Sequence, residues 1–238
     1  MISIVTPTYN EAENVEAFTE GIAGIVKDIP EPVELIFVDA ESPDGTAGVI
    51  RRLQATYPFV RLLERPKQSF GHALLAGCDQ AKGDYLTVMD ADRCQDPHDL
   101  VRLYAKLQEG SADMVIGSRY AKGGRTIGKS WWRVLGSRIL NRVSIIALKL
   151  PLSDATHPFR LFHRRVYEQV RHHIHVTGHP SLIVELTYRV YQAGFTFGEI
   201  PVVYRERNAG RSKLNLLPET WNFLRCLVAL KNERRASQ

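Results

Sequence analysis

The chain has 238 residues, of which 44% are hydrophobic and 24% are charged, and its formal net charge is +5 at pH 7. These values exclude a disordered protein and allow one large folded domain, or one domain with an appendage. The net positive charge suits an anionic partner, such as nucleotide phosphates, a membrane surface or nucleic acid, but it does not distinguish among these partners.

The first half of the sequence alternates short apolar runs, typical of strands, with segments of helical periodicity. Strands are predicted at residues 2–9, 33–40, 60–65, 84–92 and 112–120, and helices at residues 11–27, 44–57, 71–82 and 96–110. Strands and helices that alternate through short loops form right-handed β–α–β units. The pattern therefore predicts an α/β fold with a mostly parallel sheet flanked by helices.

The second half is less regular. Helices are predicted at residues 130–150, 181–194 and 217–238, a strand leading into a helix at 159–170, and one or two strands at 195–207. The first of these helices carries one apolar stripe, made of Trp132, Leu135, Ile139, Val143 and Ile146. Its tryptophans fit the core and a membrane interface equally well. The basic, amphipathic tail helix likewise fits a membrane interface, the domain surface or a partner subunit.

The cysteines and the first residues predict a cytoplasmic protein. Cys78, Cys94 and Cys226 are odd in number and widely spaced, which is typical of reduced thiols. The chain starts directly on a strand-like run and lacks the basic and apolar regions of a signal peptide. No stretch approaches the roughly 18 uncharged apolar residues of a membrane span. We expect a soluble protein or one bound peripherally at the cytoplasmic face of a membrane.

Polar side chains follow four of the predicted strands at the point where each strand ends. They are Pro7, Tyr9, Asn10 and Glu11, then Asp39, Glu41, Ser42 and Asp44, then Asp90 and Asp92, and finally Ser118, Arg119 and Tyr120. Ligands of parallel sheets bind beyond the carboxyl ends of the strands, which meet at one edge. The sequence therefore predicts one functional cluster at that edge.

Asp90 and Asp92 predict a metal site within this cluster. Residues two apart in an extended chain point the same way, so both carboxylates can face one ion. Oxygen ligands at a strand end suit Mg²⁺ or Mn²⁺, and Gln95 is a further candidate ligand or a neighbour of the ligands. A divalent ion that bridges a diphosphate would neutralise the charge of a departing nucleoside diphosphate.

Six ordered segments carry a resemblance to a known family. They are PTYNEAENV, FVDAESPDGT, MDAD, VIGSRYAKGG, FRLFHR and RNAGRSKL. Together they resemble the inverting glycosyltransferases of family 2 with the GT-A (Rossmann-like) fold, and more narrowly the polyprenyl-phosphate (dolichyl-phosphate) mannose synthases. In that family a sugar passes from a nucleoside diphosphate to the phosphate of a membrane polyprenol. The resemblance implies a GT-A domain over residues 1–215, with an amphipathic basic helix at 216–238.

The resemblance also implies roles for individual residues. The nucleotide pocket would be lined by Pro7, Tyr9, Glu11 and Asp39. The metal would be held by Asp90, Asp92 and Gln95, with Asp92 and Arg119 as the catalytic residues and Arg119 on the acceptor or donor phosphate. Further phosphate contacts would come from Arg133 and Ser137, and from a late loop with Arg207, Ser212 and Lys213.

The helix at 130–150 supports part of this assignment independently. Arg133, Ser137 and Asn141 recur every four residues and so share one helix face, away from the apolar stripe. Arginine is suited to bidentate contact with phosphate. We therefore expect this face to grip a phosphate group.

Two positions depart from the family pattern. Ala40 follows Asp39 where the family usually has a second acidic residue, so the sequence does not determine which nucleotide base the protein prefers. His157 and Pro158 precede the arginine-containing element where the family commonly has small residues. We expect the second departure to preserve shape and to shift the selectivity for acceptor or sugar.

The expected function is metal-dependent, inverting transfer of mannose from GDP-mannose to a polyprenyl phosphate. An acceptor phosphate is already anionic at neutral pH, so it needs no strong general base. UDP-glucose is the rival donor. Peripheral membrane contact is expected, with a membrane-anchoring subunit as a further candidate partner.

Three other functions remain open. Transfer to a sugar hydroxyl would need a carboxylate base, for which Glu185 and Asp154 are the candidates, and Glu185 is expected to face the site. A catalytically silent sugar-nucleotide-binding subunit would bind the donor without turnover. Binding of nucleic acid is disfavoured, because the basic residues are interspersed with acidic ones and no stacking motif accompanies them.

Overall fold

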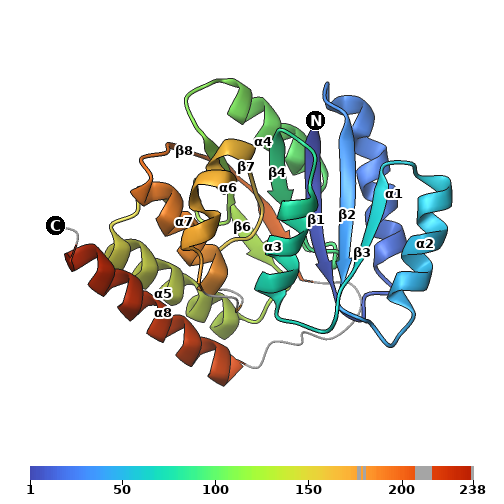
Figure 1. Ribbon diagram of the computed structural model, residues 1–238. Coiled ribbons are helices and arrows are strands. Elements are labelled where there is room, and N and C mark those ends of the chain that lie inside the picture. The colour runs from blue at the N-terminus through green and yellow to red at the C-terminus, as the bar shows by residue number, and fades with distance from the viewer. Residues whose placement is uncertain (176–177, 179–180, 207–215, 237–238) are drawn as a thin grey trace.

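A central sheet organises the computed structural model, which describes residues 1–175, 178, 181–206 and 216–236 (Figure 1). Seven strands follow the order β3-β2-β1-β4-β7-β5-β8. Their bounds are Ile2–Thr8 (β1), Val33–Asp39 (β2), Val60–Glu64 (β3), Tyr85–Val88 (β4), Met114–Ser118 (β5), Arg160–His163 (β7) and Phe197–Pro201 (β8). In this sheet β7 runs antiparallel to β4 and β5, and the other four pairs are parallel. The expected mostly parallel α/β fold is therefore confirmed.

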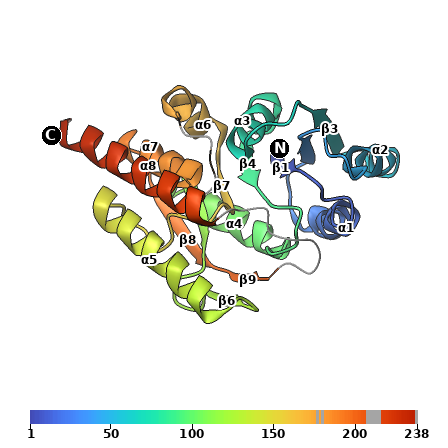
Figure 2. The same cartoon turned by 90° about the horizontal axis from the view of Figure 1, so that it is seen from below.

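Helices cover both faces of the sheet, as Figure 2 shows. One face carries α1 (Val15–Ile25), α2 (Thr46–Thr56) and α4 (His98–Gln108). The other carries α3 (Phe70–Gln80), α6 (Arg164–Val170) and α7 (Ser181–Gln192). Because both faces are covered, burial is continuous along β2 and interrupted only at Pro7 in β1, and β2 is largely an apolar run.

Two further helices and a short ribbon complete the described chain. The helices α5 (Trp131–Leu148) and α8 (Leu216–Ala236) lie side by side in Figures 1 and 2, and α8 shares a small apolar core with α5 and α7. The ribbon pairs β6 (Arg125–Ile127) with β9 (Val203–Arg205) in parallel. Among the described helices, none is both long and apolar enough to cross a bilayer. The division into residues 1–215 and 216–238 stays a prediction.

The strand register brings the predicted functional residues to one edge. Thr8 at the end of β1 pairs with Asp39 at the end of β2, and these ends point down in Figure 1. Thr87 of β4 and Val115 of β5 both pair with Leu161 of β7. Thr87 and Val115 therefore lie level on either side of Leu161, and the chain leaves β4 and β5 on either side of the start of β7.

The apolar stripe of α5 faces outward. Trp131 and Ile146 are 76% and 62% exposed, and Trp221 of α8 is 63% exposed. We define the outer apolar face as the exposed large apolar side chains of these two helices, namely Trp131, Trp132, Leu135, Ile139, Val143, Ile146, Trp221, Leu224 and Val228. The opposite face of α5 packs inward through small and polar residues such as Asn141 and Ser144. This resolves the position of the tryptophans, which lie at the surface and not in the core.

Close packing of α3 on the sheet generates a prediction at Gly77. A Cβ at this position would lie 2.4 Å from Cγ1 of Val5 and 2.8 Å from Cγ2 of Val38, on two buried strands. We expect Gly77→Ala to lower the free energy of unfolding by about 1–3 kcal/mol, because buried β-branched side chains cannot easily move aside. Urea unfolding followed by circular dichroism measures the change.

The control is Gly48→Ala in α2, where an added Cβ meets no atom within 4 Å. Here the helix propensity of alanine should raise the free energy of unfolding by about 0.5–1 kcal/mol. Equal stabilisation by both substitutions would contradict the packing of α3 described above.

Candidate active site

The ends of β1 and β2 form a hydrogen-bonded frame around Asp39. The buried Asp39 carboxylate accepts hydrogen bonds from Oγ1 of Thr8 at 3.0 Å and from the backbone N and Oγ of Ser42 at 2.9 and 2.6 Å. Ser42 in turn accepts from the backbone N of Asn10 at 2.9 Å. Asn10 and Glu41 hold positive φ angles of 56° and 50°, a conformation that non-glycine residues adopt rarely. Asp39 therefore fixes two strained loops at the sheet edge.

Pro7, Tyr9 and Glu11 lie on the first of these loops or beside it. Pro7 pairs with Val38 across the sheet. The hydroxyl of Tyr9 accepts from Nζ of Lys67 at 2.9 Å, and the carboxylate of Glu11 accepts from Asn14 at 2.6 Å. The structure thus brings together all four residues assigned to the nucleotide pocket, and it places Lys67 with them.

Asp90, Asp92 and Gln95 lie on one tight turn beyond β4. Oδ1 of Asp92 accepts from the backbone N of Cys94 at 3.0 Å, and Oε1 of Gln95 accepts from the backbone N of Asp90 at 3.4 Å. Asp92 and Gln95 are only 5% and 4% exposed. Nε2 of Gln95 is buried and has no hydrogen-bond partner in the described chain.

This donor set fits a hydrated divalent ion. Two carboxylates can bind the ion, and a buried amide with unused donor capacity can hold a water or a phosphate oxygen beside it. No group of three or more His, Cys, Asp or Glu side chains in the described residues forms a denser metal cluster. Such a set suits Mg²⁺ or Mn²⁺, which keep water and substrate oxygens as ligands, better than a closed structural metal site.

Beyond β5, Arg119 is held by the fully buried carboxylate of Asp154. Nε and Nη2 of Arg119 donate to Oδ2 and Oδ1 of Asp154 at 2.8 and 3.0 Å. Nη2 also donates to Thr156 at 2.8 Å, whereas Nη1 makes a long contact of 3.4 Å with Oγ of Ser137. Burial alone would raise the pKa of Asp154, but the charge and hydrogen bonds of Arg119 hold it below its ordinary value. The guanidinium is therefore fixed with Nη1 toward Ser137.

The loop that carries Asp154 is itself held from three sides. Glu199 of β8 accepts from the backbone N and Oγ of Ser153, at 2.9 and 2.8 Å. Asn141 of α5 donates to the carbonyl of Ser153 at 2.7 Å. The fully buried Arg160 donates to the carbonyl of His157 and to Thr187, and desolvation lowers its pKa to about 10. Asn141 is thus used inside the protein and does not join a phosphate-gripping face.

His157, one of the two departures from the family pattern, is a buried neutral side chain. Its Nδ1 lies 2.6 Å from the carbonyl oxygen of Gly117, and its ring lies edge-on to Tyr204 at 5.5 Å between centroids. Desolvation and the nearby charge of Arg119 lower its pKa to about 3. His157 therefore fills space behind Arg119 without adding charge.

The residues of α5 and the late loop that were assigned to phosphate binding lie in three different settings. Ser137 joins the Arg119 cluster and also lies 3.0 Å from the hydroxyl of Tyr120. Arg133 is exposed, and its guanidinium lies 5.2 Å from the ring of Trp132. The late-loop residues Arg207, Ser212 and Lys213 lie outside the described residues.

The structure adds two residues that the sequence analysis did not identify, Lys129 and Tyr204. Nζ of Lys129 lies 4.2 Å from the centroid of the Tyr204 ring, and the guanidinium carbon of Arg119 lies 6.0 Å from the same centroid. Tyr204 lies close enough to Cys94 and Asp92 for both to raise its pKa. The pairing of β6 with β9 creates this contact, and no local sequence pattern reports it.

Both candidate general bases are engaged elsewhere. Asp154 is paired with Arg119 as described. Glu185 is 1% exposed and forms an ion pair with Arg189 at 3.2 Å, and Arg189 also binds Glu233 of α8 at 2.6 Å. The expectation that Glu185 faces the site is wrong, because this carboxylate belongs to a network that joins α7 to α8.

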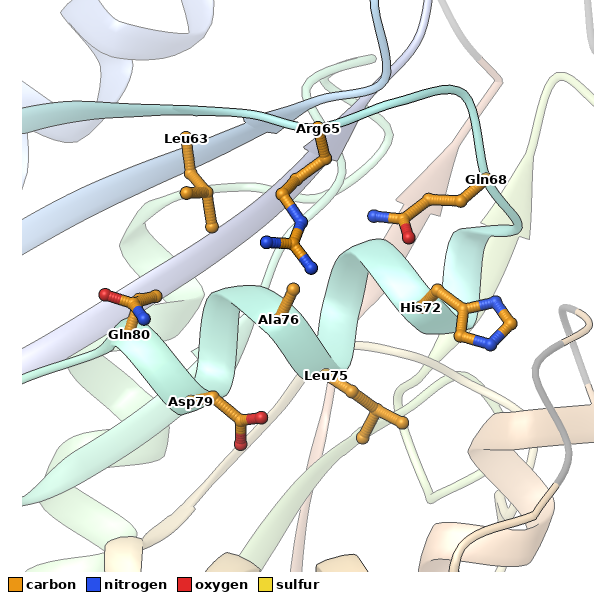
Figure 3. A pocket seen from close by; sticks show the side chains of 8 residues that line it. All are labelled: Leu63, Arg65, Gln68, His72, Leu75, Ala76, Asp79 and Gln80. Carbon is orange, nitrogen blue, oxygen red and sulfur yellow. The ribbon is translucent and has the colours of Figure 1, made fainter.

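The hollows of the described surface include the following two. One, of about 510 Å³, lies between α5 and the turn after β5, and it is lined by Arg119, Tyr120, Gly124, Arg138, Ile139, Asn141, Arg142, Ile145, Leu152 and Ser153. We call it the α5 groove. The other, of about 270 Å³, lies between β3 and α3 (Figure 3). No residue assigned from the sequence lines the second hollow, and its Asp79 is bound to Arg171 and Tyr167.

Comparisons with known sequences agree with this geometry. The profile of Glycosyl transferase family 2 matches residues 3–171. Polyprenol monophosphomannose synthase of Mycolicibacterium smegmatis is 34% identical over 217 residues, which cover 89% of this chain and 80% of that protein. Dolichol-phosphate mannosyltransferase of Pyrococcus furiosus is 30% identical over 217 residues, covering 90% of this chain but only 59% of that protein.

Solved structures confirm the expected GT-A fold. Glucosyl-3-phosphoglycerate synthase of Mycobacterium tuberculosis, in complex with Mn²⁺, UDP and glucosyl-3-phosphoglycerate, matches with a TM-score of 0.74 at 17% identity, over 98% of this chain and 80% of that one. A mannosyltransferase of Pyrobaculum calidifontis, in complex with GDP-Man and Mn²⁺, matches with a TM-score of 0.63 at 20% identity, over 96% and 63%. At these identities the likeness concerns the fold.

The buried Arg119–Asp154 pair generates a stability prediction. We expect Asp154→Asn to lower the free energy of unfolding by about 3–5 kcal/mol at pH 7, because removing one partner leaves a buried charge uncompensated. The matched control is Glu64→Gln, which breaks the exposed pair with Arg51 and should change stability by less than about 1 kcal/mol. Chemical unfolding of both variants measures the difference.

The Arg119–Asp154 pair also makes the free energy of unfolding depend on pH. The pKa of Asp154 in the folded protein lies below its ordinary value of 3.8. The ionised carboxylate therefore contributes fully to the free energy of unfolding above pH 3.8, and this contribution is lost as the pH falls toward the pKa of the folded protein. The gap in stability between the natural protein and Asp154→Asn should therefore narrow below about pH 4. A gap that stays constant from pH 7 to pH 3 would show that ionisation of Asp154 does not stabilise the fold.

Proposed function

The chain belongs to glycosyl transferase family 2, and we propose that this glycosyltransferase moves mannose from GDP-mannose to a polyprenyl phosphate, with a divalent metal and with inversion. The names of the two curated relatives support the sugar and the acceptor class. The observation that carries the proposal is a division of charge at one sheet edge. Acidic residues stand beyond β4, and on the other side of β7 a fixed guanidinium stands beyond β5.

The acidic side would hold the metal. We propose Asp90 and Asp92 as ligands, with Gln95 beside them, for Mg²⁺ or Mn²⁺. The bound ion would stabilise the negative charge of the departing nucleoside diphosphate. Both structural neighbours bind Mn²⁺ with a nucleotide or nucleotide sugar, which supports a divalent ion in this fold.

The cationic side would hold phosphate. Nη1 of Arg119 and the hydroxyl group of Tyr120 both lie within hydrogen-bonding distance of Oγ of Ser137. A phosphate oxygen of the acceptor placed here attacks the anomeric carbon, and the bond from that carbon to the diphosphate oxygen breaks on the opposite side. Attack from the face opposite the leaving group inverts the anomeric configuration.

A phosphate acceptor explains why no poised base is needed. The phosphate is anionic before it attacks, so no proton has to be removed. Transfer to a sugar hydroxyl would require a carboxylate base. Asp154 is neutralised by Arg119, and Glu185 is paired with Arg189 away from the site. These two pairs favour the phosphate acceptor over the hydroxyl alternative.

The α5 groove fits an amphiphilic acceptor. Its apolar lining includes Ile139, Ile145 and Leu152, and Arg138 and Arg142 add exposed cations that form no ion pair with a carboxylate of the described chain. A prenyl chain could contact the apolar residues while phosphate lies near Arg119.

The outer apolar face supports a peripheral position on a membrane. Helix α5, which forms most of this face, carries exposed tryptophans and three arginines and has no acidic residue. Tryptophan and arginine beside an apolar stripe are typical of a helix lying in a bilayer interface. We propose contact with the cytoplasmic leaflet, where the buried reduced cysteines would be stable. A membrane-anchoring subunit is the alternative occupant of this face.

The transfer reaction is tested by incubating the protein with Mn²⁺ or Mg²⁺, a short polyprenyl phosphate, and radiolabelled GDP-mannose or UDP-glucose. We expect label in the lipid fraction from GDP-mannose, and a loss of at least about 100-fold in Asp92→Asn. The control is Asp96→Asn, an exposed carboxylate on the same loop whose hydrogen bonds within the described residues go to His98. Nucleotide binding without transfer to lipid would favour another acceptor or a silent binder.

Membrane contact is tested by flotation with vesicles of neutral and anionic phospholipid. Replacing both Trp131 and Ile146 by serine should lower the bound fraction at least about tenfold, because each apolar side chain gains more than 1 kcal/mol on leaving water. Tyr191→Ser on α7, which removes an exposed aromatic ring outside the face, is the control. Unchanged flotation of the double variant would instead favour a protein partner at this face.

A further inference from the structure

Lys129 places an ammonium group near both Arg119 and the turn that carries Asp90, Asp92 and Gln95, which we call the metal turn. It follows β6 and Gly128, whose φ of +86° turns the chain against Glu206. The backbone N of Glu206 donates to the carbonyl of Ile127 at 2.9 Å, so the β6–β9 ribbon fixes this turn. Nζ of Lys129 lies 4.2 Å from the centroid of the Tyr204 ring, within cation–π range.

Tyr204 connects this ammonium to the metal turn. The backbone N of Arg205, the next residue, donates to the carbonyl of Cys94 at 2.9 Å. Burial raises the pKa of Tyr204, and the nearby Cys94 and Asp92 raise it further. The ring is therefore held between the turn that carries Asp92 and the ammonium of Lys129.

Two cations lie near the Tyr204 ring, and they differ in whether a carboxylate pairs with them. Arg119 lies 6.0 Å from its ring but is paired with Asp154. Lys129 is half-buried and forms no ion pair with any carboxylate of the described residues. Desolvation, and then the charge of Arg119, lower the pKa of Lys129, whereas Cys94, Asp92 and Glu206 raise it by less. A half-buried cation beside another cation is stabilised by an anion that approaches both.

We infer that Lys129 binds a phosphate oxygen of a substrate, as a cation additional to the metal and to Arg119. The inference rests on the proposed function, because it takes the anion to be a phosphate of the donor or of the acceptor. Its place beside the Asp92 turn favours the donor diphosphate. Tyr204 is then a positioning residue, which holds the ammonium through its ring without touching the substrate.

The test compares Lys129→Met with the natural protein. Methionine keeps an unbranched stem over the Tyr204 ring and removes the charge. Calorimetric titration with GDP and with GMP, each in the presence of Mn²⁺, measures the donor side, and the KM for polyprenyl phosphate measures the acceptor side. Lys122→Met, which removes an exposed lysine from the turn after β5, is the matched control.

For a donor contact we expect GDP to bind about tenfold more weakly to Lys129→Met, since a charge-assisted hydrogen bond is lost. GMP, which lacks the second phosphate, should change less, and Lys129→Arg should restore most of the affinity for GDP. For an acceptor contact, the KM for polyprenyl phosphate should rise by a similar factor while GDP affinity is unchanged.

The inference is overturned if Lys129→Met, folded by circular dichroism, matches the natural protein in GDP affinity and in acceptor KM. That result leaves the proposed function intact, because the natural protein still binds and transfers. If the natural protein binds no nucleoside diphosphate and moves no sugar, the proposed function fails and this inference fails with it.

Discussion

The buried pair of Arg119 and Asp154 is the interaction on which the site depends. A carboxylate with no exposure to water requires compensation, and Asp154 obtains it from two guanidinium nitrogens and from backbone N–H groups of its own loop. Buried ion pairs add little net stability, because desolvation offsets their attraction. Their value here is geometric, since two of the three guanidinium nitrogens are fixed and the third faces Ser137.

The surroundings of this pair explain the unusual residues that follow it. Glu199 and Asn141 clamp the loop from β8 and α5, so the carboxylate cannot withdraw from Arg119. Arg160 lies behind the loop, and the charge of Asp154 partly offsets the desolvation of its guanidinium. A protonated histidine at position 157 would add another positive charge to a buried region, and its lowered pKa keeps it neutral. The departure from the family pattern thus changes volume and not charge.

Local patterns predicted the seven strands of the main sheet, the helices and the cluster at the strand ends, because periodicity and strand polarity are properties of short segments, but they did not predict β6. They could not predict that β7 enters the sheet antiparallel, since that depends on pairing between distant residues such as Thr87 and Leu161. Lys129 and Tyr204 were missed for the same reason, as their contact requires β6 to pair with β9. Amphipathicity identified the stripe of α5 but not its direction. The small and polar side chains of Asn141 and Ser144 pack inward, and the tryptophans face outward.

Helix α5 connects the proposed chemistry to the proposed membrane surface. Its inner side holds the Asp154 loop through Asn141 and approaches Arg119 through Ser137. Its other sides line the groove and form most of the outer apolar face. A rigid helix that contacts lipid on one side would fix the distance between the bilayer and Arg119. An acceptor whose prenyl chain stays in the bilayer would then bring its phosphate to the cationic side, while the proposed donor would bind with the metal at the acidic side. The separation of the two charges along the sheet edge would therefore give the two proposed substrates separate binding positions.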